Sequence, residues 1–288
     1  MKLGLGTAQM GMSYGVANSS GQVPIKDAGV ILNHARLCGL DTIDTAIAYG
    51  DSENVLGQLG ISNWNIVTKL PSVPDNCFDI HQWVFDQIEL SLKRLGASNL
   101  YAVLLHRPGQ LLDNFGRDLY EALEELRFRG VTRKIGISVY DKAELENLFY
   151  DFQFDLIQAP FNILDRWLVE SDWARRLHNL GIEIHARSIF LQGLFLIPPN
   201  QRPSKFDRWS DVWSEWDRWL AYTGLSPLEA CLRYVYNFSE INRIIVGVDT
   251  PVQLNQIIEA TKGHLDSLPG FKTLSDTRLI NPSTWDQL

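Results

Sequence analysis

The sequence predicts a single-domain (β/α)8 barrel, and three observations support this fold class. Eight short apolar runs alternate with longer segments of helical periodicity along the chain. Most of these runs are continuously apolar, which is typical of strands buried on both faces of a parallel sheet. The length of 288 residues suits one barrel of about 250 residues with added loops. A doubly wound open sheet is the competing architecture, but eight strands that alternate with helices favour the closed barrel.

Each expected strand is followed by a turn, and most of the strands are then followed by a clear helix. The expected strands are Leu3–Gly6, Leu40–Asp44, Asn65–Lys69, Tyr101–His106, Lys134–Ser138, Leu156–Ala159, Glu183–Arg187 and Ile244–Gly247. The clearer helices are Ile25–Leu37, Trp83–Leu95, Leu119–Arg129, Lys142–Tyr150, Glu170–Leu180, Pro227–Tyr236 and Pro251–Ala260. Glycines at 39, 96, 130 and 181 follow four of these helices, where a left-handed residue is favoured.

Three segments are expected to add to the regular barrel. An insertion near residues 12–24 follows the first strand, on the rim where barrel enzymes carry their active sites. The loop near residues 189–208 follows the seventh strand, and its length and prolines predict a lid over a ligand. A C-terminal tail covers residues 261–288. The segment Trp209–Trp219 holds four tryptophans at helical spacing, which predicts an aromatic helix face packed on the barrel.

Composition narrows the class of protein. Thirty-four acidic and 26 basic residues give a net charge of −8, which argues against nucleic acid or an anionic membrane as partner. The N-terminal segment lacks the apolar region of a signal peptide, and no apolar run is long enough for a membrane span. The three cysteines have no metal-binding spacing and the histidines are scattered, so no metal site is expected. These features predict a cytoplasmic protein.

Four polar residues stand where a barrel enzyme keeps its catalytic groups. Asp44, Lys69 and His106 end the second, third and fourth expected strands, and Tyr49 lies in the loop after the second. Catalytic residues of (β/α)8 barrels come from the C-terminal ends of strands and the loops beyond them. Taken singly, each residue has a common structural explanation, such as a turn former or a buried histidine. Their places on three adjacent strands instead predict one shared site.

The motifs around these residues resemble the catalytic tetrad of the aldo-keto reductase family. Asp-Thr-Ala-x-x-Tyr-Gly begins at Asp44, Val-Thr-Lys ends at Lys69, and an apolar strand ends at His106. The resemblance covers nearly the whole chain and includes Gly-Ile-Ser at 136–138, Gln158 with Phe161 and Asn162, Ala186-Arg187-Ser188, and Gly247 with Pro251. It implies a monomeric, NAD(P)H-dependent oxidoreductase that reduces an aldehyde, ketone or sugar-like carbonyl.

The chemistry of carbonyl reduction explains why these four residue types belong together. Hydride addition places negative charge on the carbonyl oxygen, so a proton donor must stand beside it. Free tyrosine is a weak acid with a pKa of about 10, and a neighbouring ammonium stabilises its phenolate. We therefore predict Tyr49 as general acid, Lys69 as the cation that strengthens it, and Asp44 as the partner that holds Lys69. His106 is predicted to orient the substrate oxygen as a hydrogen-bond donor.

The cofactor is expected in the loops after strands seven and eight, because no Gly-x-Gly-x-x-Gly motif opens a helix. Barrels bind phosphates in those loops, where Gly193 and Gly247 lie. The helix that begins at Pro251 adds free N–H groups for a phosphate. The resemblance implies further contacts, with Ser138, Gln158 and Asn162 at the nicotinamide carboxamide, Arg187 at the nicotinamide face, Ser188 at the pyrophosphate and Gln253 near the adenosine.

Asp249 departs from the family pattern. NADPH-dependent members usually carry a basic residue just after the strand-eight turn, where it pairs with the 2′-phosphate. A carboxylate in that place repels a phosphate and suits a free ribose 2′-hydroxyl. The family habit predicts NADPH, with Arg243 or Lys262 supplying the positive charge, and NADH is the alternative.

Two other functions stay open at the level of sequence. One is a regulatory barrel that binds the nicotinamide cofactor with little or no turnover, although the complete tetrad weighs against it. The other is a barrel lyase or isomerase, for which the sequence holds no cluster of metal ligands. The substrate is not named by the rim residues expected around it, which are Gln9, Met10, Arg107, Tyr140 and Phe190.

Overall fold

The computed structural model describes residues 1–18, 20–270 and 276–288. Ser19 of the expected insertion and residues 271–275 of the expected tail lie outside the described residues. Eight parallel strands pair in chain order, and β1 pairs with β8 to close the barrel, which confirms the predicted (β/α)8 fold. The strands are β1 (Leu3–Gly6), β2 (Thr42–Asp44), β3 (Asn65–Leu70), β4 (Leu100–Leu105), β5 (Thr132–Ser138), β6 (Leu156–Pro160), β7 (Glu183–Arg187) and β8 (Arg243–Gly247).

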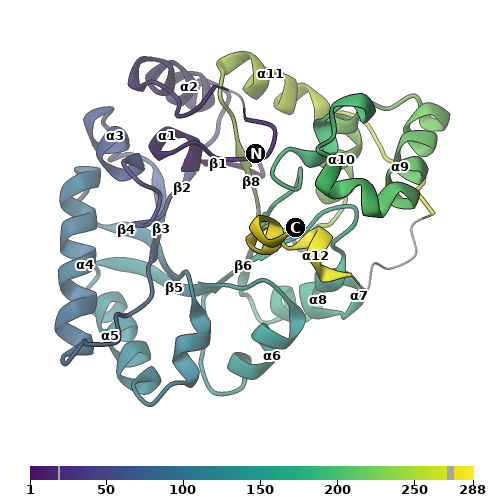
Figure 1. Ribbon diagram of the computed structural model, residues 1–288. Helices are drawn as coiled ribbons and strands as arrows, with labels where there is room; N and C mark the ends of the chain where they lie inside the picture. The colour runs from purple at the N-terminus through teal and green to yellow at the C-terminus, as the bar shows by residue number, and fades with distance from the viewer. Residues whose placement is uncertain (19, 271–275) are drawn as a thin grey trace.

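Helices surround the barrel (Figure 1). They are α1 (Ala8–Gly11), α2 (Ile25–Leu37), α3 (Ser52–Gln58), α4 (Ile80–Leu95), α5 (Gly116–Phe128), α6 (Lys142–Phe149), α7 (Trp167–Glu170), α8 (Trp173–Asn179), α9 (Ser210–Thr223), α10 (Pro227–Tyr236), α11 (Pro251–Ala260) and α12 (Thr277–Ile280). Short 3-10 turns are η1 (Pro108–Leu112), η2 (Leu194–Leu196), η3 (Pro199–Gln201), η4 (Ser204–Trp209) and η5 (Pro282–Gln287).

The expected bounds of α2, α10 and α11 are confirmed to the residue. Helix α4 begins three residues before its expected start, because the Asp79 side chain accepts a hydrogen bond from Gln82 N–H and caps the helix there. The helix expected over Glu170–Leu180 is confirmed as α8 over Trp173–Asn179, but its expected start is wrong. Glu170 instead ends α7, and Asp172 between the two helices has a left-handed φ of 67°. Helices α1 and α3 were not expected, since both are short.

The strands carry two apolar layers. A large core lies between the sheet and the helices, and a small cluster fills the barrel interior. The interior cluster comprises Val67, Ala102, Leu104 and Leu156. Because alternate residues of a strand face the same side, the side chains two positions further along β3, β4 and β6 also face the interior. These are Lys69, His106 and Gln158, so the apolar plug forms the floor beneath a polar layer.

The tryptophan-rich segment forms α9, as its spacing predicts. Trp213, Trp216 and Trp219 are buried, and the Phe195 ring of η2 packs on Trp216 with ring centroids 5.1 Å apart. The C-terminal segment docks against η4, which leads into this helix: the ring centroids of Trp285 and Phe206 lie 4.8 Å apart. In Figure 1 the end of the yellow C-terminal segment, beyond α12, lies in front of the barrel. Helix α9 therefore supports the loop after β7 and is not itself part of the barrel ring.

None of the helices in the described ranges is long and apolar enough to cross a lipid bilayer.

Candidate active site

A cleft of about 640 Å³ opens at the C-terminal ends of the strands. Its wall includes strand-end residues from around the barrel and the loops that follow β1, β7 and β8. The predicted site residues that line it are Asp44, Tyr49, His106, Ser138, Gln158, Arg187, Ser188, Gly193, Gly247, Asp249 and Gln253. The tertiary structure thus brings most of the predicted catalytic and cofactor residues to one cavity.

A buried ion pair lies at the base of this cleft. Lys69 Nζ donates to Asp44 Oδ1 over 2.6 Å and to the Thr45 carbonyl oxygen over 2.9 Å. The two side chains are only 1% and 5% exposed. Gln158 Nε2 donates to the other carboxylate oxygen of Asp44, also over 2.6 Å. Burial alone would lower the pKa of Lys69, but the Asp44 carboxylate and the Tyr49 phenol together raise it.

Tyr49 lies above this pair, with Lys69 Nζ 5.1 Å from the centre of its ring. Two glycines fix the loop that carries it. A Cβ atom at Gly11 would overlap the Tyr49 carbonyl oxygen, and Gly50 has a left-handed φ of 55° against the Gly11 backbone. The close approach of these backbones therefore needs glycine at both positions and sets the direction of the tyrosine.

His106 stands beside Tyr49, with the two rings edge to face and their centroids 5.7 Å apart. Burial lowers the pKa of His106 to about 3, and the positive charges of Lys69 and Arg187 add to this shift. The imidazole is therefore neutral at physiological pH. A neutral imidazole can donate one hydrogen bond to a carbonyl oxygen without carrying a net charge.

The β7 loop begins with residues in the left-handed conformation. Ser188, Leu191 and Gln192 have φ values of 58°, 49° and 51°. Asn162 is fully buried behind this wall and does not line the cleft, contrary to the contact expected from resemblance. Its side-chain amide donates to the Ser188 carbonyl oxygen over 3.1 Å. Asn162 thus holds the loop backbone in its left-handed turn.

The β8 turn places Asp249 in the cleft wall. Its Oδ1 atom is buried without a hydrogen-bond partner, and burial raises its pKa. Gln253 accepts from the Asp249 and Thr250 N–H groups and belongs to the capping box of α11. The N-terminal turn of α11 is therefore ordered and faces the cleft.

Neither expected basic residue reaches Asp249. Arg243 lies at the opposite end of β8, where it donates to Thr42 and Asp41. Lys262 follows the far end of α11 and pairs with Glu259. The expectation that one of them serves a 2′-phosphate is therefore wrong.

Three of the five residues expected around the substrate lie at the cleft. Gln9, Tyr140 and Phe190 line the cleft. Met10 instead belongs to the apolar core, with 1% exposure, and Arg107 is exposed and does not line the cleft.

Several lining residues escaped sequence reasoning, among them Tyr14, Asn18, Gln192 and Ile245. The signal available for Tyr14 was an aromatic residue followed by glycine in a rim insertion. No group of three or more His, Cys, Asp or Glu side chains in the described parts of the chain could hold a metal ion.

Comparison with known proteins identifies the family. A family model described as the aldo/keto reductase family matches residues 2–268. The chain belongs to this family. Aldo-keto reductases are oxidoreductases that act on carbonyl compounds with NAD(P)H, so the resemblance of the tetrad motifs is confirmed at the level of the family.

Individual relatives of this aldo-keto reductase are distant. An NADH-specific methylglyoxal reductase of Escherichia coli (strain K12) is 25% identical over 268 residues, which cover 80% of this chain and 81% of that protein. A glyoxal reductase of Bacillus subtilis (strain 168) is 28% identical over 161 residues, or 55% of this chain and 56% of that protein. The holo form of aldo-keto reductase AKR11C1 from Bacillus halodurans has the same fold, with a TM-score of 0.72 at 18% identity and coverage of 96% and 95%.

Proposed function

We propose that this aldo-keto reductase uses NADH to reduce a small aldehyde or ketone, with Tyr49 as general acid. One observation carries the proposal. The buried Asp44–Lys69 pair lies directly beneath the Tyr49 ring at the base of a cleft long enough to be lined by the β1, β7 and β8 loops. A cation that is paired, buried and set against a phenol is suited to stabilise the phenolate.

In the proposed reaction, Tyr49 Oη holds the proton that the carbonyl oxygen receives. The Lys69 ammonium stabilises the phenolate left behind, and Asp44 keeps that ammonium in place through the 2.6 Å contact. His106, neutral because its pKa is lowered to about 3, orients the carbonyl oxygen by donating a hydrogen bond. General acid catalysis of this kind contributes about 10²- to 10⁴-fold to the rate.

The residues of the cleft fit a nicotinamide dinucleotide. When bound, the cofactor would supply the hydride. We assign its carboxamide to Ser138 and Gln158, its nicotinamide face to Arg187, and its pyrophosphate to the backbone from Ser188 to Gly193. A Cβ atom at Gly247 would overlap the Gln9 side-chain amide, so the glycine allows Gln9 to lie against the β8 turn. Asn162 is assigned the support of Ser188 in place of a direct contact.

The preference for NADH rests on charge at the β8 turn. Asp249 Oδ1 is buried and lacks a partner, and a ribose 2′-hydroxyl would supply the missing donor. Of the lining residues described, Arg187 alone is an arginine or lysine, and it lies at the barrel end of the cleft. A 2′-phosphate would therefore meet a carboxylate and no base. The E. coli relative is likewise named as NADH-specific.

We further propose that residues 189–196 of the expected lid loop cover the bound cofactor. Ile189, Phe190 and Leu196 line the cleft. Pro282 and Ser283 of the C-terminal tail line it as well, so the tail is assigned a share in closing the site.

The test combines binding and turnover. Tryptophan fluorescence is titrated with NADH and with NADPH, and oxidation of the tighter cofactor is then followed with glyoxal and methylglyoxal. We expect saturable quenching by both dinucleotides, with a lower dissociation constant for NADH. Turnover should fall by about 10²- to 10⁴-fold in Tyr49→Phe. Binding of NADH should be nearly unchanged in this variant.

Each part of the proposal can fail separately. Full turnover by Tyr49→Phe would remove Tyr49 as the acid. Tight NADH binding without turnover of any carbonyl would favour the regulatory barrel. An absence of binding to either dinucleotide would overturn the assignment of the cleft.

A further inference from the structure

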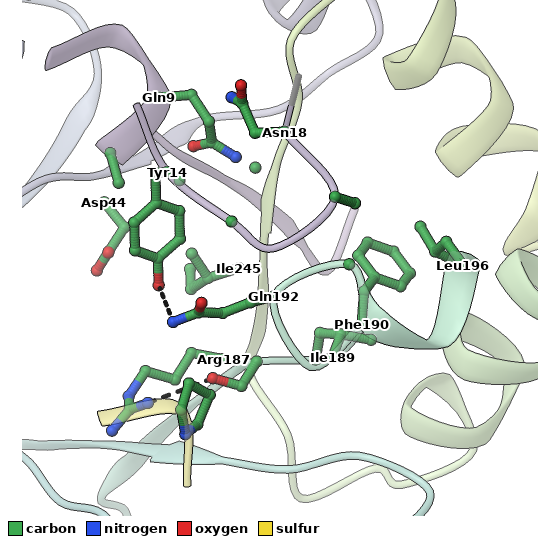
Figure 2. A pocket seen from close by; sticks show the side chains of 18 of the residues that line it. Gln9, Tyr14, Asn18, Asp44, Arg187, Ile189, Phe190, Gln192, Leu196 and Ile245 are labelled. Carbon is green, nitrogen blue, oxygen red and sulfur yellow. Dashed lines mark hydrogen bonds between the residues drawn. The ribbon is translucent and has the colours of Figure 1, made fainter. Parts of the chain in front are cut away.

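Residues 13–18, here called the strap, cross the cleft between β1 and the β7 loop. Figure 2 shows Tyr14 on this segment facing Gln192 of the β7 loop, with Arg187 on the same side of the cleft. Val16 N–H donates to the Gln192 carbonyl oxygen over 3.1 Å. Gly193 has a left-handed φ of 91°, and a Cβ atom there would lie 2.8 Å from the Ala17 Cβ. The strap is therefore held closely against the β7 loop.

This attachment places the Tyr14 side chain in the wall of the cleft together with Tyr49, Tyr140 and Arg187. Gln192 Nε2 donates to the Tyr14 hydroxyl oxygen over 3.5 Å. In the described part of the chain, no side-chain or backbone atom accepts a hydrogen bond from the Tyr14 hydroxyl. A hydroxyl that is held in position by an amide, yet has its own hydrogen to donate, is suited to bind an oxygen atom of a ligand.

Tyr14 remains a donor across the useful pH range. Burial raises its pKa to about 12, and the Tyr49 and Tyr140 phenols act in the same direction, while Arg187 and the hydrogen bond from Gln192 lower it. Tyr14 and Tyr49 line the same cleft. A ligand with two oxygen atoms can therefore meet two separate phenolic donors there.

Arg187 makes this space attractive to an electronegative atom. Its guanidinium donates to the Val139 carbonyl oxygen over 3.0 Å and to Ser188 Oγ over 3.3 Å, both of which are neutral groups. It also stacks over the Tyr140 ring at 4.5 Å. No carboxylate in the described residues forms an ion pair with it. Its positive charge is therefore available to the contents of the cleft.

We propose that Tyr14 is a specificity-determining residue that donates a hydrogen bond to a second substrate oxygen, on the carbon next to the reacting carbonyl. This inference rests on the proposed function, in which Tyr49 and His106 hold the carbonyl oxygen itself. The substrate class is then the α-oxygenated aldehydes and ketones, such as 2-oxoaldehydes and hydroxyaldehydes. Tyr14 is 38% exposed, so with a substrate that lacks the second oxygen its hydroxyl returns to water. Such a substrate gains no hydrogen bond from Tyr14, and its kcat/KM is lower by the value of that bond.

The test compares two aldehydes that differ by one oxygen, 2-oxopropanal and propanal. In Tyr14→Phe we expect kcat/KM for 2-oxopropanal to fall by about 3- to 10-fold, the value of one neutral hydrogen bond. The value for propanal and the dissociation constant for NADH should be unchanged. Intrinsic reactivity cancels, because each aldehyde is compared between variant and wild type.

Two more variants complete the design. Tyr222→Phe removes a phenolic hydroxyl from the exposed face of α9 and should leave kcat/KM unchanged for both aldehydes. Gln192→Met removes the amide that holds the Tyr14 hydroxyl and should lower the ratio of kcat/KM for 2-oxopropanal to that for propanal by a smaller factor. This ratio is measured at saturating NADH, because Gln192 lies in the loop assigned to the cofactor. This second variant keeps the test decisive if Tyr14→Phe does not fold.

Four results would overturn the inference. Equal loss for both aldehydes would mean that the hydroxyl does not read the second oxygen. Weaker NADH binding in Tyr14→Phe, with turnover otherwise unchanged, would make Tyr14 a cofactor latch. If the wild type turns over both aldehydes and neither variant has an effect, the inference alone is overturned. If the wild type binds NADH but turns over neither aldehyde, the proposed function is overturned with it.

Discussion

The two sides of the cleft differ in how their polar side chains are satisfied. On the β2–β4 side, Lys69 donates to Asp44 over 2.6 Å and both are buried, and Gln158 of β6 donates to the other Asp44 oxygen over 2.6 Å. On the β7–β8 side, Asp249 Oδ1 lacks a partner and the loop after β7 runs through left-handed residues. A site whose groups are already paired is preorganised for one step of chemistry. A wall with unpaired groups is complete only when a ligand is bound.

The barrel explains this division. The β2–β4 residues stand on strands, whose positions are fixed by the hydrogen bonds of the sheet and by the apolar plug beneath them. The β7–β8 residues stand on loops whose shape depends on local contacts, such as that of Asn162 with Ser188. Three variants test whether the two sides differ in this way.

The largest effect is expected from Lys69→Met on the preorganised side. The change leaves the Asp44 carboxylate buried without its cation, which costs about 3–5 kcal/mol of the free energy of unfolding. Chemical denaturation at neutral pH measures this loss, and turnover should fall with it. The double variant Lys69→Met/Asp44→Asn should regain part of the stability but not the activity. Equal stability of Lys69→Met and wild type would mean that the pair is not the rigid base of the site.

A smaller effect is expected from the pH dependence of stability at His106. Its folded pKa is depressed to about 3, whereas an unfolded histidine titrates near 6.5. Below that pH the unfolded chain binds a proton that the folded site refuses, so stability falls as pH drops towards 3. The free energy of unfolding of wild type, relative to His106→Gln, should decrease by up to about 1.4 kcal/mol per pH unit in this window.

Denaturation of both proteins between about pH 4 and about pH 8 provides this measurement, because the range spans the pKa of an unfolded histidine. Above the unfolded pKa both forms of His106 are neutral and the difference should be constant. A difference that stays constant down to the acid end would show that His106 takes up its proton as readily in the folded protein as in the unfolded chain, which would contradict the lowered folded pKa.

The smallest effect is expected on the ligand-dependent side. Asp249→Arg replaces the carboxylate of the β8 turn by a base, so the ratio of NADPH to NADH affinity should rise by about 10-fold or more, the value of a charge-assisted hydrogen bond. Fluorescence titration with both dinucleotides measures the ratio. Asp113→Arg, an equal change of charge in the exposed loop after η1, should leave it unchanged. An unaltered ratio in Asp249→Arg would place the ribose elsewhere.

The sequence alone determined the barrel, because its signals are local. Continuous apolar runs marked the strands, and helix punctuation gave α2, α10 and α11 their bounds. The meeting of Asp44, Lys69, His106 and Tyr49 on one rim could also be predicted, since the first three lie at or directly after strand ends and Tyr49 lies in the loop after β2. Short or interrupted elements were missed where one side chain decides the outcome, as at Asp172 in the break between α7 and α8.

Only the tertiary structure decided which loop residues reach the cleft. Asn162 matched a family landmark but turns away to hold Ser188, and Arg243 stands in the right strand but at its wrong end. Tyr14 carried no motif, yet the strap brings it to Arg187 and Gln192 through a contact 176 residues away in sequence, between Val16 and Gln192. The direction of a loop side chain depends on such long-range contacts and close backbone approaches, which leave no periodic trace in the sequence.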